Sequence, residues 1–464
     1  MLGGSIAGLL AARVLAEVYQ RVTVVERDEL PADRTTHRPG VPHGRHVHGL
    51  LARGREAMEE LLPGLTAELV AQDAPTGDML GNARWFLGGR RMPRTPSGLL
   101  AVCASRPLIE GTIRDRVRAL PNVSIMDGCD IVGIVSSPDQ AWITGVRVVN
   151  RRGPLAVPVS AGSRGARSAR SSCVAMVLDA DLVVDATGRG SRTPSWLTTL
   201  GYRRPVEERV EIGMGYATRL YEVSPGAFGA DAVVVNGRYP GQVRGGVLQA
   251  VEGGRCLLSL AGMAGDHPGL EPVAFDAYAK SLPFPDTYEI ISSARPLTDP
   301  VPFRFPASLR RRYERLDRFP AGLLVTGDAV CSFNPVYGQG MSVAALEALA
   351  LRRELARGGE PRWRRYFAAV ARQVDAPWAM TSGGDLAILG VVPRGRKARM
   401  LGRYMARLQA AAADDPVLAR AFIRVAGLAE RPQSLLRPDR VVRVLRHGRR
   451  NARKTALEPH PTMA

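Results

Sequence analysis

The sequence lacks several features that would place it in a specialised class of protein. No run of residues approaches the ~20 apolar residues of a membrane span, and the first residues do not have the basic-then-apolar layout of a signal peptide. The five cysteines are odd in number, widely spaced and without a Cys-x-x-Cys pair, which disfavours a disulfide framework or a zinc site. We therefore expect a cytoplasmic protein without a membrane span or a bound metal.

A motif for nucleic-acid recognition is also missing, although the chain is strongly basic. Lys and Arg number 63 against 44 Asp and Glu, which gives a formal net charge of +19. Because the basic residues are mostly arginine and scattered, we do not expect nucleic acid as a partner. Clusters occur at residues 310–312 and 440–454; for the second we expect a helix with a solvated face or a frayed tail, with docking of an acidic carrier as the alternative.

The remaining composition is that of a globular protein of two or three domains, with 464 residues of which 45% are hydrophobic. Apolar runs predict strands within residues 21–30, 123–128, 143–150, 181–191 and 322–330. Residues 340–355 predict a long helix, and the pattern stays helical to about residue 430. Residues 210–262 predict an antiparallel sheet, and the small, basic segment 161–172 predicts a flexible loop.

The chain opens with "MLGGSIAGLL", which reads as a glycine turn that enters a helix. In a dinucleotide-binding fingerprint, the residues at Gly3, Ser5 and Gly8 allow a tight turn and close approach of the backbone to a pyrophosphate. Ser5 stands where the second glycine is usual. Glu26 ends the next predicted strand, where an acid that binds the ribose hydroxyls is expected. The turn, helix, strand and acid in this order predict nucleotide binding, whereas the glycines alone would indicate only an ordinary turn.

The position of this turn at the start of the chain leaves no room for the β-strand that should precede it. Only Met1 and Leu2 come before Gly3, yet the strand before such a turn is central to the parallel sheet. We expect the true start to lie upstream of Met1, with a Val/Ile-rich strand. Without that strand, we expect a chain that folds poorly and binds its nucleotide weakly.

A second motif, "LLVTGDAVCSFNPVYGQGMSVAALEA", spans residues 323–348. A buried strand ends in a Gly-Asp turn, and Asp328 can accept a hydrogen bond from a sugar-alcohol hydroxyl. The loop from Pro335 to Met341 can approach a flat ring because Gly338 and Gly340 lack side chains. The N-terminus of the following helix would stabilise negative charge on that ring.

A third motif, "DLVVDATGRGSR" at residues 181–192, is a second strand that ends in a glycine turn, expected near the first. The three motifs, in this order and spacing, resemble the group A flavoprotein monooxygenases of the para-hydroxybenzoate hydroxylase fold. Segments 38–51, 104–117 and the Gly-Asp motif are similar to the flavin epoxidases of polyether biosynthesis, of the lasalocid and monensin epoxidase type. The similarity extends to about residue 385.

The resemblance implies a bound FAD and assigns it contacts in this chain. Gly3, Ser5 and Gly8 would hold the pyrophosphate and Glu26 the ribose. The other implied contacts are cationic donors (Arg45 and Arg106), a pyrophosphate or ribitol contact (Asp328) and contacts to the isoalloxazine (Pro335, Gly338, Gly340 and Met341). A cluster of His43, His46 and His48 next to Arg45 is better explained by its place beside a flavin loop than as a metal site, because no carboxylate or cysteine has matching spacing.

The chain departs from the aromatic hydroxylases of this fold at one point. Where those enzymes carry Asp-Gly, this chain has Thr187-Gly188. The change puts fast reduction by NADPH in doubt, so the flavin would be reduced by NAD(P)H directly or through a separate flavin reductase. The Trp-x-Trp-x-Ile-Pro run of tryptophan halogenases is missing, which argues against halogenation.

The function that the resemblance implies is FAD-dependent monooxygenation, with O2 as co-substrate. A flavin C4a-hydroperoxide would epoxidise alkenes of an apolar, polyketide-like or terpenoid substrate, free or carrier-bound, in secondary metabolism. No catalytic side chain is assigned, because such chemistry needs position and dryness more than acid–base groups. Candidate residues of the substrate pocket are Tyr216, Arg219, Phe303 and Trp378. Alternatives are an aromatic hydroxylase, a flavin-dependent reductase of prenyl double bonds and a flavin-free binding protein.

The fold class expected is α/β (α+β), with a Rossmann-like FAD-binding domain, an inserted antiparallel-sheet substrate domain and a C-terminal helical region. The FAD-binding domain is expected in three parts, residues 1–75, 103–200 and 306–356. The substrate domain is expected from residues 76–102 and 201–305. Residues 357–464 are expected to form the helical region with a basic tail.

Overall fold

A computed structural model describes the chain except for residues 88, 152–174, 238–241, 393–394 and 458–464, and for residues 448–457 it describes the backbone only. The loop expected at 161–172 lies outside the described residues. Helices of the first two thirds of the chain are α1 (Ile6–Leu15), α2 (Ala52–Leu61), α3 (Leu65–Val70), α4 (Arg106–Arg118), α5 (Thr193–Thr199), α6 (Pro272–Lys280) and α7 (Asp286–Ser292). The last third adds α8 (Gly340–Leu355), α9 (Trp363–Ile388), α10 (Arg396–Ala412), α11 (Pro416–Ala426) and α12 (Pro438–Leu457).

A parallel sheet lies at the centre of the half of the molecule that contains α1. Two strand pairs form it, β1 (Val22–Val25) with β7 (Val123–Met126) and β11 (Val183–Asp185) with β18 (Leu323–Val325). Leu2 joins the two pairs, because it forms parallel bridges to both Val25 and Asp185. Leu2 is 1% exposed and therefore lies in the position expected for the strand before the glycine turn.

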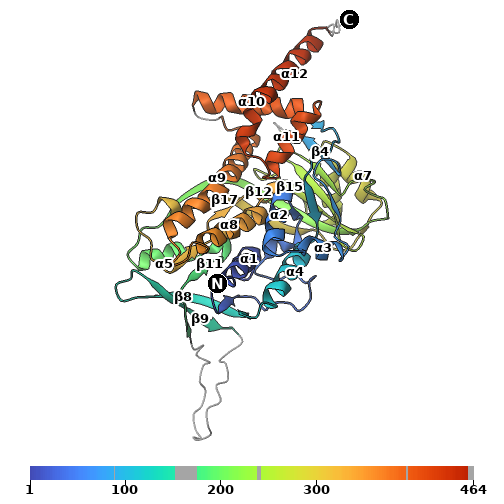
Figure 1. The fold of residues 1–464 in the computed structure, drawn as a ribbon. Helices are drawn as coiled ribbons and strands as arrows, with labels where there is room; N and C mark the ends of the chain where they lie inside the picture. The colour runs from blue at the N-terminus through green and yellow to red at the C-terminus, as the bar shows by residue number, and fades with distance from the viewer. Residues whose placement is uncertain (88, 152–174, 238–241, 393–394, 458–464) are drawn as a thin grey trace.

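The helix α1 is buried on almost every side, which matches its apolar sequence IAGLLAARVL. It lies beside α8 and α4 (Figure 1). Its apolar side chains join those of β1, β11, β18 and α8 in the largest hydrophobic core of the molecule. This core fixes the start of α1, and with it the glycine turn, against the ends of the parallel strands.

A second, larger sheet forms the other half of the molecule. Its strands follow the order β19-β17-β12-β15-β14-β13-β4-β5, and β16 pairs with β12. Their bounds are β4 (Ala83–Leu87), β5 (Arg90–Arg91), β12 (Val206–Glu222), β13 (Val233–Asn236), β14 (Gly245–Val251), β15 (Arg255–Gly262), β16 (Arg295–Pro296), β17 (Val301–Arg312) and β19 (Cys331–Ser332). All its pairs are antiparallel except β4–β13, which is parallel.

Two small sheets complete the strands that the structure describes. One follows the order β10-β9-β8 and the other the order β2-β6-β3. Their bounds are β2 (Gly49–Leu50), β3 (Thr76–Asp78), β6 (Leu100–Cys103), β8 (Cys129–Ser136), β9 (Ile143–Asn150) and β10 (Met176–Asp179).

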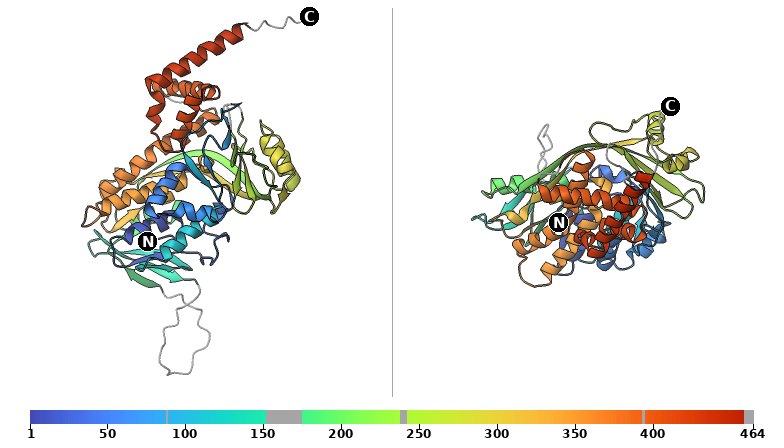
Figure 2. Two further views of the ribbon diagram at one scale, coloured as in Figure 1. Left: turned by 45° about the vertical axis from the view of Figure 1, so that its right-hand side comes forward. Right: turned by 90° about the horizontal axis from the view of Figure 1, so that it is seen from above.

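The C-terminal helices α10, α11 and α12 stand together at one end of the molecule (Figures 1 and 2). Their apolar side chains, among them Leu408 of α10 and Leu418 of α11, form a small hydrophobic core together with residues between Met79 and Leu99. The carboxylate of Asp414, beyond α10, accepts hydrogen bonds from Nη1 and Nη2 of Arg90, each at 2.6 Å. No helix within the described residues is long and apolar enough to cross a membrane.

Candidate cofactor and substrate site

The glycine turn between Leu2 and α1 is tightly enclosed. Gly3 has φ +92°, and a Cβ on it would lie 2.6 Å from the carbonyl oxygen of Ala186. A Cβ on Gly8 would lie 1.9 Å from the carbonyl oxygen of Gly3. Both positions therefore require glycine. Ser5 is the N-cap residue of α1, and its Oγ donates to Glu110 Oε2 at 2.6 Å, so the middle position of the motif has a defined partner.

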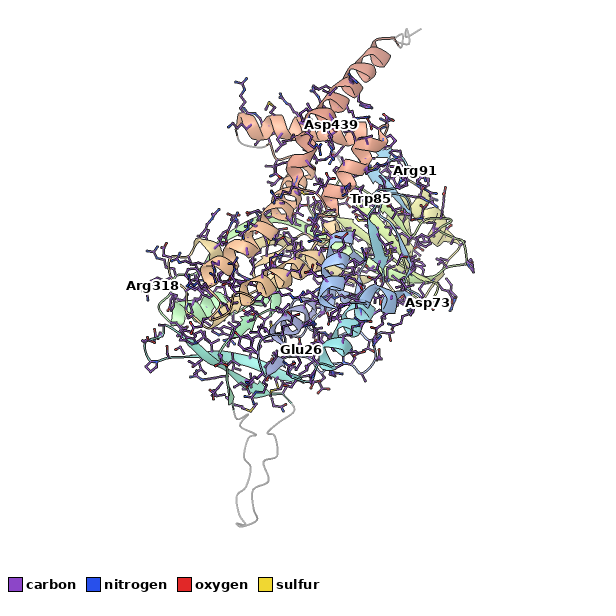
Figure 3. The ribbon with its side chains drawn as sticks, viewed as in Figure 1. Glu26, Asp73, Trp85, Arg91, Arg318 and Asp439 are labelled. Carbon is purple, nitrogen blue, oxygen red and sulfur yellow. The ribbon has the colours of Figure 1, made fainter. Side chains whose placement is uncertain are left out.

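Glu26 directly follows β1 and is 6% exposed. Its Oε2 accepts from the backbone N–H of Gly4 at 2.6 Å, and its Oε1 accepts from that of Asp28 at 2.9 Å. Figure 3 places Glu26 in the lower part of the molecule, below α1. The carboxylate is therefore held at the glycine turn, where a ribose bound beside α1 would lie within its reach.

Next to this turn is a buried network of charged side chains. Arg106, at the start of α4, donates through Nη2 to Ser5 Oγ at 2.8 Å and to Glu110 Oε2 at 3.0 Å. Arg38 donates through Nε to Glu110 Oε1 at 2.7 Å and through Nη1 to Asp28 at 3.1 Å. Burial would raise the pKa of Glu110, but Arg106 and Arg38 lower it to about 2. The network therefore keeps Glu110 ionised and fixes two arginines beside the turn.

One nitrogen of this network has no partner among the described residues. Arg38 Nη2 is buried and makes no hydrogen bond, although a buried donor normally has an acceptor. Arg38, Arg106 and Arg114 line a small cleft with Glu110 between the 36–44 segment and α4. An anionic group that entered this cleft would supply the missing acceptor.

Asp328 lies in the turn that follows β18, at the same edge of the parallel sheet. Gly327 has φ +66°, and a Cβ on it would lie 2.6 Å from the Cβ of Ala7 in α1. Glu347 of α8 holds the turn, because its Oε2 accepts from Thr326 Oγ1 at 2.7 Å and from the Gly327 N–H at 2.5 Å. The side chain of Asp328 remains exposed.

The loop from Pro335 to Met341 leads into α8 and is held from behind. Asn334 Nδ2 donates to Asp385 Oδ1 of α9 at 2.7 Å, and Tyr337 Oη donates to the same oxygen at 3.1 Å. A Cβ on Gly338 or Gly340 would meet no atom within 4 Å. Pro335 is exposed and Met341 is buried. At Gly338 and Gly340 the loop therefore leaves open space beside its backbone, as contact with a flat ring requires.

The three histidines belong to the 42–48 segment, which lies against the larger sheet. His46 is 2% exposed, and its Nδ1 lies 2.8 Å from Thr218 Oγ1 of β12. The His46 ring is 4.5 Å from that of Tyr216 and 5.6 Å from that of Phe303, between ring centres. Burial lowers the pKa of His46 and of His43 to about 3, and that of His48 well below its usual value. All three imidazoles are therefore neutral at physiological pH.

A metal site is not formed in this region. Within the described residues, no group of three or more His, Cys, Asp or Glu side chains is arranged to hold a metal ion. The histidines instead pack against aromatic rings; His43 and His48 have ring centres 5.5 Å apart.

The structure does not bring the four candidate pocket residues together. Tyr216 and Phe303 are direct cross-strand partners on β12 and β17, with ring centres 5.2 Å apart. Arg219 is on the opposite face of β12, where it donates to the Thr298 carbonyl at 2.9 Å and lies 3.7 Å from Asp276. Trp378 belongs to the hydrophobic core around the parallel sheet, apart from the cluster that contains Tyr216. The four therefore do not line one cavity.

A small, partly open cleft lies between the larger sheet, the 35–45 segment and the start of α4. Thr218 and Leu220 line it from β12, on the face that also carries Tyr216, because alternate residues of a strand share a face. Ser105 and Pro107, the neighbours of Arg106, line the other side. Its apolar lining residues are Pro107, Leu220, Val251, Leu257 and Val301.

Arg45 also lines this cleft. It is exposed, and within the described part of the chain it makes neither a hydrogen bond nor an ion pair. Its guanidinium is therefore available to an anionic group, as is expected of a residue that contacts a phosphate.

Sequence reasoning missed four buried residues that support the site: Arg38, Glu110, Glu347 and Asp385. Each is a buried charged residue that positions another group. Arg38 and Glu110 lie inside two of the segments that carry the resemblance, and Glu347 lies near the end of the Gly-Asp motif. A charged residue within an otherwise apolar stretch of helix, as Glu347 is in "SVAALEALAL", is the signal that could have identified it.

Comparison with solved structures identifies the fold. The fold is similar to those of a flavoprotein/dehydrogenase from Cytophaga hutchinsonii (TM-score 0.66, 13% identity, 98% of each chain), the flavin-dependent brominase Bmp2 (0.61, 14%, 98% of each chain) and p-nitrophenol 4-monooxygenase PnpA from Pseudomonas putida DLL-E4 (0.60, 16%, 92% of this chain and 96% of that one). The chain thus has the fold of FAD-dependent monooxygenases and flavin-dependent halogenases. This result confirms the expected fold class.

At the level of sequence, the chain is 38% identical over 440 residues to protein Rv3254 of Mycobacterium tuberculosis (strain ATCC 25618 / H37Rv). The aligned region covers 91% of this chain and 88% of the relative. The chain belongs to the family of that protein. No family model matches the sequence.

Proposed function

We propose that this chain binds FAD and is a flavin-dependent monooxygenase. The observation that carries the proposal is the convergence of three turns at the carboxyl edge of the parallel sheet. The glycine turn at Gly3, the turn after β11 and the Gly327-Asp328 turn all follow strands of that sheet. Ligands of such sheets bind at this edge, and the fold of the structural relatives supports a flavin as the ligand.

The groups already in place fit the parts of FAD. The backbone N–H groups at the start of α1 and the guanidinium groups of Arg106 and Arg45 suit a pyrophosphate. Glu26 suits the ribose hydroxyls, and Asp328 suits the ribitol. The unpartnered Nη2 of Arg38 would gain an acceptor from an adjacent anionic group.

Once reduced, bound FAD would supply the two electrons with which one atom of O2 enters the substrate and the other leaves as water. The side chains of this chain would contribute position and dryness. Tyr216, Phe303 and His46 form a packed, uncharged wall over β12 and β17. A wall of this kind excludes water from the reacting atoms.

The substrate that suits the cleft best is an apolar chain with carbon–carbon double bonds, of the polyketide-like or terpenoid kind, which the enzyme would epoxidise. The apolar part of the cleft lining, which adjoins polar and charged residues, supports this proposal. Whether free or bound to a carrier, such a chain would enter the cleft beside Arg45.

The reductant is a separate question, because Thr187 stands where related hydroxylases carry an aspartate. Thr187 Oγ1 donates to Asp185 Oδ1 at 2.6 Å. We propose that a separate flavin reductase reduces the flavin more efficiently than NAD(P)H alone.

The activity test is oxygen consumption and product mass with a panel of apolar alkenes, NAD(P)H and a flavin reductase. Epoxidation consumes O2 and adds one oxygen atom from 18O2 to the alkene. Incorporation into a phenol ring would assign the aromatic hydroxylase alternative. Addition of two hydrogens without O2 uptake would assign the prenyl reductase alternative, and bromide- or chloride-dependent product would assign halogenation.

The matched variants for this test are Arg106→Gln and Arg204→Gln. Arg106 is in the network beside the glycine turn, whereas Arg204 is exposed and makes no ion pair in the described part of the chain. We expect Arg106→Gln to weaken FAD binding about tenfold or more, because a charged hydrogen-bond donor is worth about 1.5–3 kcal/mol. Equal FAD affinity of the two variants would contradict the assignment of Arg106.

A further inference from the structure

The first turns of α10 form a helix surface without a partner in the described chain. Residues 396–403 are all exposed, whichever side of the helix they face. Large apolar side chains are among them: Met400 is 68% exposed and Leu401 49% exposed. Val391 and Val392, just before α10, are 49% and 71% exposed. Exposed apolar groups gathered on one element indicate contact with another surface.

The uncovered side of α10 continues a face that is buried further along the helix. Leu408, Ala411 and Ala412 pack against the neighbouring C-terminal helices and are at most 1% exposed. Leu401 and Met400 lie seven and eight positions before Leu408, close to the same helical face. The helix therefore projects beyond the body that it packs on, at the end of the molecule that carries α12 (Figure 1).

The adjoining face of α10 is entirely basic. Arg396, Arg399, Arg403 and Arg407 follow one another at three- and four-residue spacing, so they line one side of the helix. Within the described residues, none of these four side chains makes an ion pair. Lys397 adds a further positive charge, and the sequence from 386 to 413 contains no Asp or Glu.

We propose that Val391, Val392 and the first turns of α10 form a docking surface for an anionic lipid bilayer; we call these residues the α10 arm. A bilayer surface offers apolar chains and negative headgroups at the same place, and both are needed to cover adjoining apolar and basic faces. A second copy of this chain would bring another basic α10 arm against the first, so its charge disfavours that occupant.

The test is co-sedimentation of the full chain with vesicles of phosphatidylcholine alone or with about 30% phosphatidylglycerol, at about 0.1 M and about 0.5 M salt. We expect binding only to the anionic vesicles, weakened by the higher salt. Arg399→Gln/Arg403→Gln should weaken binding roughly twenty-five-fold, from about fivefold for each arginine near an anionic surface. Met400→Ser/Leu401→Ser should weaken it about a hundredfold or more, because two apolar side chains that the bilayer would bury are lost.

The matched control is Val273→Ser/Arg204→Gln, which changes an apolar residue that is 82% exposed and an exposed arginine outside the α10 arm. It should bind within about twofold of the original chain. Absence of binding to anionic vesicles, or equal binding of all variants, would overturn the proposal. Two further results would also overturn it: a dimer that Met400→Ser/Leu401→Ser dissociates, which assigns a second copy, and retention on polyaspartate without vesicle binding, which assigns an acidic protein.

Discussion

Ser5 Oγ lies 2.6 Å from Glu110 Oε2, so the glycine turn at the start of the chain is tied to the second turn of α4. Glu110 is 4% exposed and also accepts from Arg106 and Arg38. The hydroxyl of Ser5, where a glycine is usual, is thereby built into the charged network that faces the proposed pyrophosphate.

The first prediction concerns the pH dependence that Glu110 gives to stability. Its pKa falls from 4.5 to about 2 on folding, so the folded state favours the ionised carboxylate. The contribution of Glu110 to the free energy of unfolding should therefore be fully present above about pH 4.5. It should fall by about 3 kcal/mol as the pH drops to about 2. Glu110→Gln should lack this contribution, which urea unfolding across that pH range will measure.

The control for this experiment is Glu60→Gln, which changes an exposed carboxylate. We expect its unfolding free energy to follow that of the original chain throughout. If Glu110→Gln followed it too, the network would not hold Glu110 ionised. At neutral pH, Glu110→Gln should cost about 3–5 kcal/mol, because it leaves two buried arginines short of negative charge.

The second prediction is a pH dependence of opposite sign from Glu347. Burial raises its pKa from 4.5 to about 7, so the folded state favours the protonated carboxyl. Stability from this group is present below about pH 4.5 and is lost as the pH rises to about 7, a fall of about 3 kcal/mol. Glu347→Gln keeps an oxygen for Thr326 and Gly327 and should abolish the fall. A slope that persists in this variant would assign the effect to another group.

The third prediction tests the glycine turn. Gly3→Ala should lower the free energy of unfolding by about 2–4 kcal/mol, because it adds a backbone clash to a positive φ. Gly383→Ala in α9 meets no atom within 4 Å and should be neutral or should stabilise by up to about 1 kcal/mol. Thermal unfolding compares the two, and similar stabilities would contradict the geometry of the turn.

The fourth prediction concerns the support of the Pro335–Met341 loop. Asp385→Ala removes the acceptor of Asn334 and Tyr337, so the loop should lose its position and FAD affinity should fall by about 2 kcal/mol. Asp385→Asn keeps one oxygen and should show a smaller loss. Asp439→Ala, at the opposite end of the molecule from Glu26 (Figure 3), is the control. Flavin fluorescence titration measures all three, and an unchanged affinity of Asp385→Ala would contradict this role.

Local patterns in the sequence were sufficient to predict the turns of the site. At Gly3, Gly8 and the Gly327-Asp328 turn, the residue types alone indicate a tight backbone turn. The helix expected at 340–355 has those bounds in the structure. The network of Arg38 and Glu110 joins residues 72 positions apart, and no local pattern fixes such a pairing. The parallel pairing of β4 with β13 is likewise set by tertiary packing.

The separation of Arg219 from Tyr216 was open to prediction. The two residues are an odd number of positions apart on one strand, and alternate residues of a strand face opposite sides. A long predicted strand therefore excludes one shared pocket for both. The position of Trp378 could not be predicted in the same way, because the buried face of α9 packs on more than one neighbour along its length.

The most direct test of the proposed function is the visible absorbance of the purified chain after incubation with excess FAD and removal of free flavin. We predict a yellow protein with about one flavin per chain and a flavin band shifted by the protein environment. The Gly3→Ala variant, examined in the same way, should retain much less flavin. A folded chain, verified by circular dichroism, that retains no FAD would contradict the proposal that this site is a flavin site.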